Sequence, residues 1–283
     1  MRVAVIGANG QLGTDLVKIF GKEAIPFLHK DLDVTNPDSF EVLIQKNPEI
    51  IINTAAFHKT DACEEAPYET FLVNSVGAKN ISEISNKIGA VNVYISTDYV
   101  FDGRADVPYT EEDRPNPINI YGTSKYAGEL ITSNYSNRYY IFRVSSLFGV
   151  AGASGKGGNF VETMISKAER NEEIKVVDDV FMSPTYTKDA AIMIKKVLDK
   201  NLIFGIYHMN NEGYCSWHEF AREIFNLTNM EPKLKAINSE DTYTKAKRPK
   251  FSGLENGNLE KNGFRMQSWR IALKEYLTEK RYI

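Results

Sequence analysis

The sequence predicts an α/β protein with a doubly wound parallel sheet, and three observations support that prediction. Apolar, β-branched runs alternate with amphipathic helical stretches through the first half of the chain. A glycine-rich turn directly follows the first of these runs. The length of 283 residues and a charged content of 25% are those of a globular protein that can bury a sizeable core. We therefore expect a parallel sheet with helices on both faces.

The first half contains five expected strands joined by four expected helices. Apolar and β-branched residues place the strands at 3–6, 25–28, 50–53, 91–96 and 139–144. Helical periodicity places the helices at 11–20, 37–45, 69–88 and 121–134. Crossovers of this length between parallel strands are right-handed, which favours the doubly wound arrangement.

The second half alternates less regularly and is expected to form a smaller, mainly substrate-binding domain over residues 151–283, which closes over whatever the first half binds. Its helices are expected at 160–170, 188–198, 216–227 and 267–277, and its strands at 175–178 and 206–209. Residues 187–209 are expected to return to the sheet, so the two domains interleave. Two loops are expected near the site: the acidic, proline-containing segment 98–120, and the glycine-rich segment 151–158, read as a mobile loop or as a flexible connector.

Charge and cysteine content exclude several classes of protein. The formal net charge is −3 and no stripe of Lys and Arg follows an expected helix, so no nucleic-acid partner is expected. Cys63 and Cys215 lie far apart without a CxxC partner, so neither a disulfide framework nor a zinc site is indicated. No apolar run approaches the roughly 20 residues of a membrane span. We expect a cytoplasmic protein without a membrane partner.

The turn at 7–13, GANGQLG, stands between the first expected strand and the first expected helix. In this setting Gly7 allows a tight turn, Gly10 lets the backbone approach a pyrophosphate, and Gly13 lets helix and strand pack closely. The helix that follows presents free N–H groups and positive partial charge. We therefore expect residues 1–150 to form a dinucleotide-binding Rossmann domain.

The end of the second strand is where the 2′ position of a dinucleotide is read. His29 and Lys30 favour NADPH, because basic groups accommodate a 2′-phosphate. Asp31 or Asp33 would instead meet a free ribose hydroxyl, as in NADH. We expect NADPH and leave NADH open; the alternative is that His29 and Lys30 form a solvated turn.

Small side chains follow the third strand, and one polar residue interrupts the helix after it. Ala55, Ala56 and Phe57 stand where a dinucleotide lies close across a strand tip. Asn74 follows the apolar residues 71–73, so it either satisfies a buried backbone group or steadies the cofactor site.

A phenol and an ammonium stand four residues apart in YGTSK at 121–125, on one face of an expected helix. Free tyrosine titrates near pH ~10, and a nearby cation stabilises the phenolate, so Tyr121 and Lys125 suit proton transfer. Thr97, at the end of the fourth strand, is expected to donate to a carbonyl oxygen as negative charge develops. Ser96 competes for that role, since strand neighbours point oppositely. Asp98 is expected to accept from a sugar hydroxyl.

These motifs together resemble the extended short-chain dehydrogenase/reductases, and more narrowly the dTDP-4-dehydrorhamnose reductases. The resemblance covers almost the whole chain. Its motifs are GANGQLG at 7–13, STDYVFDG at 96–103, YGTSK at 121–125, GGNF at 157–160, SPTYTKD at 183–189 and AKRPKFSGL at 246–254. The first and third mark the superfamily, whereas STDYVFDG with the SPTYTKD and RP segments is specific to the narrower family.

The resemblance implies reduction of the 4-keto group of a dTDP-6-deoxy-4-ketohexose by NAD(P)H, giving dTDP-L-rhamnose. It implies that Tyr121 donates the proton, that Thr97 stabilises the transition state and that Asp98 touches the sugar nucleotide. The implied cofactor positions are Gly10, Gln11, Leu12, Asp33, Val34, Ala55, Ala56, Phe57, Tyr121 and Lys125. Family members are often homodimers, some with magnesium between subunits, and Asp15 and Asp189 stand where carboxylates would serve such a metal.

One departure from the family concerns the substrate side of the site. Where well-known members read RTSW after the fifth strand, with the aromatic ring packed on the substrate, this chain has Ser146. The identity of the sugar is therefore open. Lys245, Lys247, Arg248 and Lys250 either reach a substrate diphosphate or form a solvated basic face. Arg248 is the expected contact.

Two other functions fit the same fold. Sugar-nucleotide dehydratases and epimerases use an internal redox cycle, and dehydratases usually place an acid directly after Thr-Asp, where this chain has Tyr99. A non-catalytic NADP-binding regulatory subunit is the other alternative. It is disfavoured because Thr97, Tyr121 and Lys125 are all present.

Overall fold

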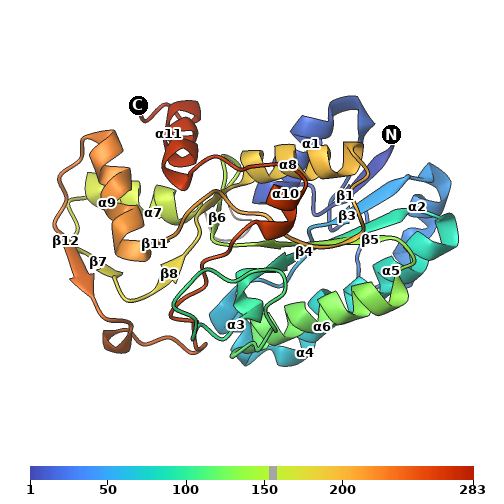
Figure 1. Ribbon diagram of the computed structural model, residues 1–283, viewed down its shortest axis with the longest axis horizontal. Helices are drawn as coiled ribbons and strands as arrows, with labels where there is room; N and C mark the ends of the chain where they lie inside the picture. Colours follow the sequence, from blue (N-terminus) through green and yellow to red (C-terminus); the bar gives the residue numbers. More distant parts are fainter. Residues whose placement is uncertain (153–157) are drawn as a thin grey trace.

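A six-stranded parallel sheet forms the centre of the molecule (Figure 1). The computed structural model describes residues 1–152 and 158–283. The strands are β1 (Val3–Ile6), β2 (Ala24–Phe27), β3 (Ile50–Asn53), β4 (Val91–Thr97), β5 (Tyr139–Val144) and β10 (Gly205–His208). Every pairing between neighbours in the order β10-β5-β4-β3-β1-β2 is parallel. The predicted α/β fold class is confirmed.

The winding of the sheet changes direction between β1 and β3. The chain passes from β1 to β2 on one side, and then crosses to the other side for β3, β4 and β5. In open α/β sheets, ligands bind outside the carboxyl ends of the strands at such a switch point. The order of the strands alone therefore predicts a ligand site at the carboxyl ends of β1 and β3.

Helices cover both faces of the sheet, because successive strand residues point to opposite sides. Val3 and Val5 pack into the apolar cluster under α1 (Gln11–Phe20) and α8 (Thr187–Asp199). Ala4 and Ile6 pack into the cluster on the opposite face. That face is covered by α2 (Glu41–Lys46), α5 (Gly77–Ile88) and α6 (Ile120–Tyr135) (Figure 1).

Several connections in the first half carry short helical pieces that periodicity did not resolve. They are η1 (Gly21–Glu23), η2 (Pro37–Phe40), α3 (Thr60–Glu65), α4 (Pro67–Phe71), a π-helical turn (Leu72–Val76) and η4 (Asp98–Val100). The single helix expected at 69–88 is thus α4, the π turn and α5 in succession. The helix expected at 37–45 begins as a 3₁₀ turn, whose first residue is the proline Pro37.

The smaller half packs three helices and three two-stranded sheets around its own apolar cluster. The helices are α7 (Phe160–Glu169), α9 (Trp217–Thr228) and α11 (Trp269–Glu279). The paired strands are β6 (Leu147–Phe148) with β9 (Thr185–Tyr186), β7 (Ile174–Val177) with β12 (Leu234–Ile237), and β8 (Phe181–Met182) with β11 (Cys215–Ser216). Two short helical pieces complete it, α10 (Gly257–Lys261) and η5 (Ser239–Asp241). Residues 153–157 of the expected glycine-rich loop lie outside the described residues, and the division at residue 150 stays a prediction.

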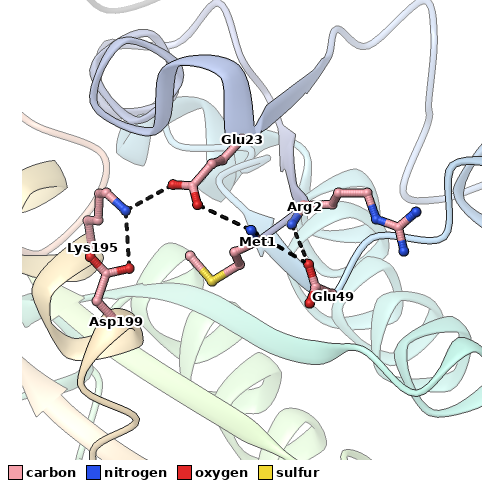
Figure 2. A network of polar contacts seen from close by, with 6 residues as sticks. All are labelled: Met1, Arg2, Glu23, Glu49, Lys195 and Asp199. Atoms are coloured by element: carbon pink, nitrogen blue, oxygen red, sulfur yellow. Dashed lines mark hydrogen bonds and ion pairs between the residues drawn. The ribbon is translucent and has the colours of Figure 1, made fainter.

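Partly exposed ion pairs connect residues at the amino end of the sheet (Figure 2). The Met1 ammonium lies 3.2 Å from a Glu23 carboxylate oxygen. Lys195 on α8 bridges Glu23 at 3.0 Å and Asp199 at 3.1 Å. This end of the molecule lies opposite the carboxyl ends of the strands. None of the helices within 1–152 and 158–283 combines the length and apolar content that crossing a membrane requires.

Candidate active site

A cavity of about 820 Å³ opens at the carboxyl ends of β1, β3, β4 and β5, at the switch point of the sheet. It falls in the upper part of the size range of cofactor and ligand pockets. Every predicted site residue except Asn74 and Arg248 lines it. These lining residues are Gly7, Gly10, Gln11, Leu12, His29, Asp33, Val34, Ala55, Ala56, Phe57, Thr97, Asp98, Tyr121 and Lys125.

The opposite wall of the cavity comes from the smaller half, and its individual residues were not predicted. Phe160, Trp217 and Phe220 line it, with the Phe160 ring 4.6 Å from Trp217 and 5.7 Å from Phe220. Asn159 joins this wall to the dinucleotide turn, because its Nδ2 donates to Gly149 O at 3.0 Å and reaches Gln11 Oε1 at 3.4 Å. The GGNF motif signalled this region without indicating its role.

The dinucleotide turn has the backbone that its glycines predict. Gly7 has φ +76°, and a Cβ there would lie 2.6 Å from Thr54 Oγ1. A Cβ on Gly13 would overlap the carbonyl of Gly7. Gly10 caps α1 without any side-chain hydrogen bond to the helix, and only the Gly7 carbonyl oxygen lies near the position of its missing Cβ. The first amides of α1 are therefore exposed toward the cavity, which fits the pyrophosphate of a dinucleotide.

At the end of β2, Asp33 holds its own loop. Its Oδ1 accepts from the amide of Thr35 at 2.9 Å and from the Thr35 hydroxyl at 2.8 Å. Burial raises the pKa of Asp33, but these hydrogen bonds and the charge of nearby His29 outweigh it and leave the pKa below its usual value. The carboxylate of Asp33 and the imidazole of His29 thus lie in the same part of the cavity, so the geometry is compatible with NADPH and with NADH.

Asn74 lies beneath the cavity, where it fixes backbone. Its Oδ1 accepts from Phe57 N at 2.9 Å, and its Nδ2 donates to Phe57 O at 3.0 Å and to Ser124 Oγ at 2.9 Å. The side chain is 1% exposed. Asn74 therefore fastens the loop after β3 to α6, and its role at the cofactor site stays a prediction.

Tyr121 stands in the first turn of α6. Asn119 caps this helix by accepting from Gly122 N at 2.7 Å, which fixes where the helix begins. Burial raises the pKa of Tyr121 well above its usual value, and a hydrogen bond with Thr97 opposes that shift. The neighbouring Tyr99 ring meets the Tyr121 ring edge-on at 6.0 Å. The phenol is therefore protonated at neutral pH and can donate.

Lys125 is one turn further along the same face of α6, 2% exposed. Its Nζ lies 4.0 Å from the centre of the Tyr94 ring. Burial lowers the pKa of Lys125 to about 7, although the charge of Glu129 opposes this. Within the described residues, no carboxylate forms an ion pair with its ammonium.

Thr97 and Ser96 point to different partners, as neighbours on a strand must. The Thr97 hydroxyl donates to Asp98 Oδ1 at 3.0 Å and accepts from Tyr99 N at 3.2 Å. The Ser96 hydroxyl donates to Glu129 Oε1 at 2.5 Å. Thr97 is therefore the hydroxyl beside Tyr121. Asp98 is only 3% exposed, and its carboxylate also accepts from two serine hydroxyls.

Arg248 lies beside Tyr99 rather than on the cavity wall. Its Nη2 donates to Asp61 Oδ2 at 3.0 Å. Its Nη1 is buried and has no hydrogen-bond partner among the described residues. Ser146 does line the cavity and has φ +43°, an uncommon backbone conformation for a residue other than glycine.

No observation on the described residues supports a magnesium ion at Asp15 and Asp189, whose carboxylates bond to neighbouring side chains. Asp15 accepts from the Thr187 hydroxyl at 2.5 Å, and Asp189 accepts from Asn211 at 2.7 Å and Gln267 at 2.9 Å. No group of three or more His, Cys, Asp or Glu residues suited to a metal is present in the part of the chain that the structure describes. The homodimer stays a prediction.

Comparison with curated sequences identifies one family across the chain. The model of the RmlD substrate binding domain matches residues 1–282. The chain is 39% identical over 283 residues to the spore coat polysaccharide biosynthesis protein SpsK of Bacillus subtilis, covering 99% of this chain and 98% of that protein. It is 31% identical over 297 residues to the dTDP-4-dehydrorhamnose reductase of Escherichia coli K12, with 99% and 98% covered.

Solved structures agree with this. The dTDP-4-dehydrorhamnose reductase of Bacillus anthracis, solved in complex with NADP, is 42% identical with a TM-score of 0.93, covering 98% of this chain and 99% of that one. The Clostridium acetobutylicum reductase is 40% identical with a TM-score of 0.94, covering 99% and 100%. A UDP-glucose 4-epimerase of Thermus thermophilus, 17% identical with a TM-score of 0.85 over 99% of both chains, shares the fold. The chain belongs to the RmlD substrate binding domain family, within which the dTDP-4-dehydrorhamnose reductases are its relatives.

Proposed function

We propose that this sugar-nucleotide reductase of the RmlD family reduces the 4-keto group of dTDP-4-dehydrorhamnose and yields dTDP-L-rhamnose, with Tyr121 as proton donor. The observation that supports the proposal best is the placement of Tyr121. Its phenol lines the cavity at the sheet's switch point together with Thr97, and Lys125 follows one helical turn later on α6.

Tyr121 suits donation in the reductive direction. A carbonyl that is reduced gains negative charge on oxygen, and a proton must reach that oxygen. Because burial keeps the pKa of Tyr121 high, the phenol holds its proton until the oxygen becomes basic enough to take it. At neutral pH the phenol is therefore in the protonated form that reduction requires, whereas the reverse reaction requires the phenolate.

Lys125 and Thr97 support the phenol in different ways. Lys125, with a pKa of about 7, exists in both protonation states near neutral pH. Its ammonium would stabilise the phenolate that donation leaves behind and would donate to the ribose hydroxyls of a bound cofactor. The Thr97 hydroxyl would stabilise negative charge beside Tyr121.

NADPH is the proposed cofactor, and when bound it supplies the hydride to the carbonyl carbon. The chain would hold it through the amides at the start of α1, the small residues Ala55 and Ala56, and the corner that contains His29 and Asp33. The Bacillus anthracis relative binds NADP, which supports the phosphorylated form. His29 would accommodate the 2′-phosphate.

The substrate side depends on Arg248 and Ser146. Arg248 lies beside Tyr99, which lines the cavity, and its buried Nη1, which has no hydrogen-bond partner among the described residues, would offer a donor to an anionic group such as a diphosphate. Because position 146 is a serine, the cavity lacks the aromatic ring that well-known family members have there. A different 4-keto-6-deoxyhexose is therefore the second candidate substrate. The relative SpsK, a spore coat polysaccharide biosynthesis protein, supports keeping it.

Purified protein incubated with NADPH and dTDP-4-dehydrorhamnose tests the reaction. We expect one NADPH oxidised per product molecule, and dTDP-L-rhamnose as the product in an NMR assignment of its stereochemistry. Turnover without net NADPH oxidation would instead indicate the internal redox cycle of an epimerase or dehydratase. NADPH binding without turnover of any keto sugar would indicate a regulatory subunit.

Replacement of Tyr121 by Phe tests the proton donor. The change removes the acid and keeps the ring, so kcat is expected to fall about 100- to 10,000-fold while NADPH affinity stays nearly unchanged. Tyr68→Phe, at an exposed position on α4, is the matched control and should leave both quantities unaltered. Substantial activity of Tyr121→Phe would show that another group supplies the proton.

A further inference from the structure

Two residues of β4 meet two residues of α6 on one face of the sheet. Tyr94 and Ser96 are two positions apart on the strand, so their side chains point the same way. Lys125 and Glu129 are one turn apart on the helix. The Ser96 hydroxyl donates to Glu129 Oε1 at 2.5 Å. The Lys125 Nζ lies over the Tyr94 ring, 4.0 Å from its centre. The strand thus gives the carboxylate a hydroxyl and the ammonium an aromatic face.

The Tyr94 side chain is also fixed at its far end. Its hydroxyl donates at 2.9 Å to Asn74 O, which belongs to the π turn. The residue is 1% exposed and packs with Ala78 and Ile141 in a small buried cluster. Moving the ring away from Lys125 would therefore break a hydrogen bond inside the core and leave a buried carbonyl oxygen without this donor.

Gly128, within α6, makes room for the phenol. A Cβ at this position would lie 2.2 Å from Tyr94 Oη and 2.6 Å from Asn74 O. Any other residue type would displace one of these two groups. A glycine inside a helix weakens that helix, because it has more conformational freedom to lose on folding. The space that the phenol occupies explains why a glycine is present here.

Glu129 does not neutralise Lys125, although it lies one turn away. Its charge opposes the effect of burial on the pKa of Lys125. The carboxylate, however, accepts from Arg143 Nε at 2.9 Å and Nη2 at 2.7 Å, as well as from Ser96. The guanidinium therefore cancels most of the field that Glu129 would exert on the ammonium.

The titratable groups toward the cavity do not neutralise Lys125 either. Tyr121 precedes it by one turn of α6, and this phenol is protonated at neutral pH. Asp98 and Cys63 raise the pKa of Tyr121, and neither acts on the pKa of Lys125. Among the described residues, the Tyr94 ring is thus the group with negative charge density that contacts the ammonium directly.

We propose that Tyr94 is a positioning residue for Lys125: its ring face holds the ammonium in place of a carboxylate and keeps the lysine charged at the edge of the cavity. The proposal rests on the proposed function, in which this ammonium supports Tyr121 and donates to the cofactor ribose. A carboxylate here would accept hydrogen bonds from the ammonium and compete with the ribose hydroxyls for its N–H donors. A ring face attracts the charge and competes less for those donors.

Fluorination of the ring separates the charge of its face from its shape. Tyr94→Phe keeps the aromatic face, whereas Tyr94→3,4,5-trifluorophenylalanine has nearly the same shape and much less negative charge on that face. Each variant is assayed as kcat against pH with NADPH and whichever keto sugar the unmodified protein reduces. Because the reaction uses the charged lysine, kcat should fall as pH rises through the pKa of Lys125. We expect the midpoint to lie about 0.4–1.5 pH units lower in the trifluoro variant than in Tyr94→Phe.

The same two replacements at Tyr140 are the matched control. Tyr140 is a buried tyrosine of β5 whose phenol also donates to a carbonyl oxygen, that of Leu202, and it packs in the cluster under α1 and α8. Neither replacement there should move the midpoint. Equal midpoints for the two Tyr94 variants would overturn the proposal, because the ring would then act through its shape alone. An equal shift from Tyr140 would also overturn it.

A comparison without substrate distinguishes failure of this proposal from failure of the proposed function. Lys125→Met is added to each Tyr94 variant, and urea unfolding midpoints are measured at pH 6 and pH 9. At pH 6 the gain from Lys125→Met should be larger in the trifluoro background, where the buried ammonium lacks its favourable ring face. At pH 9 the folded protein holds this lysine mainly neutral, so the difference between the backgrounds should shrink.

Gains that do not differ between the backgrounds at pH 6, or a difference that is the same at pH 9, would contradict the role of Tyr94. If the protein reduces no keto sugar, the proposed function fails, and the unfolding comparison still decides whether the ring stabilises the ammonium.

Discussion

Lys125 and Glu129 lie one turn apart on the same face of α6, and both are 2% exposed. Their surroundings differ completely. Glu129 receives two hydrogen bonds from Arg143, at 2.9 and 2.7 Å, and one from Ser96 at 2.5 Å. Lys125 has an aromatic ring as its neighbour and, within the described chain, no ion-pair partner. One buried charge is satisfied by the fold, and the other is left facing the cavity.

The partners of Glu129 extend into a closed network. Burial and the adjacent Arg143 lower the pKa of His208 to about 3, so this imidazole is neutral. Its Nε2 can then accept from Arg143 Nη1 at 3.5 Å, while Nδ1 donates to Glu255 O at 3.0 Å. The network fixes α6 to β5 and β10. Glu129 is held too firmly by Arg143 to neutralise Lys125, which explains why the lysine keeps a lowered pKa four residues away.

The contrast separates the groups that hold the structure from the groups that react. Buried ion pairs are rigid when complete, and a single buried ammonium is costly unless a ligand satisfies it. We therefore expect loss of a Glu129 partner to destabilise the protein and loss of Lys125 to stabilise it. Substitutions at Arg143, Lys125 and Lys195 test this expectation, and their expected effects decrease in that order.

Arg143→Met gives the largest expected change. It leaves the Glu129 carboxylate buried without its cation, and the free energy of unfolding should fall by about 3–5 kcal/mol in urea denaturation. The double variant with Glu129→Met removes both charges and should recover most of this loss. Destabilisation by less than about 1 kcal/mol would show that the Arg143–Glu129 pair does not hold this part of the structure together.

Lys125→Met should abolish turnover and stabilise the cofactor-free protein. An unfolded chain keeps this lysine protonated up to about pH 10.4, whereas the folded chain does so only below about 7. Between these values the unfolded state binds more protons, so this group makes stability rise with pH. The gain from Lys125→Met should therefore be about 2–4 kcal/mol near pH 6 and vanish near pH 10. A gain that is independent of pH would contradict the assigned pKa.

Lys195→Ala is expected to have the smallest effect. Lys195 bridges Glu23 and Asp199 at the amino end of the sheet, where solvent and salt screen the charges (Figure 2). The free energy of unfolding should fall by about 0.2–1 kcal/mol at low salt and by less as ionic strength rises. A loss comparable to that of Arg143→Met would mean that burial does not decide the strength of ion pairs in this fold.

Local patterns predicted the frame of the fold. Strands β1, β3 and β5 and helix α1 have the bounds that sequence indicated, because each is a run whose burial follows directly from its composition. The two-residue strands β6, β8, β9 and β11 are too short to carry a period, and α3 is a polar piece between turns. The π turn was missed because its residues read as ordinary helix.

For the site, residues in motifs with fixed local spacing could be predicted from the sequence, whereas contacts between residues far apart in the chain could not. GANGQLG and YGTSK place their residues through one turn and one helix. The partners of Asp98 come from positions 145 and 252, and Glu129 meets Arg143 only because α6 packs on β5. No spacing in the sequence predicts such contacts between distant residues. The role of Asn74 was anticipated as one of two possibilities, but its partners Phe57 and Ser124 depend on the packing of α6.

The π turn at Leu72–Val76 has a consequence for how relatives are compared. A π turn accommodates one residue more than the α-helix around it. Asn74 occupies that turn, and from it reaches both the loop after β3 and the helix that carries Tyr121. A homologue whose helix lacks the turn would be one residue shorter here. An ungapped alignment would then shift every position on one side of it by about 100° around the helix axis and match buried residues with exposed ones.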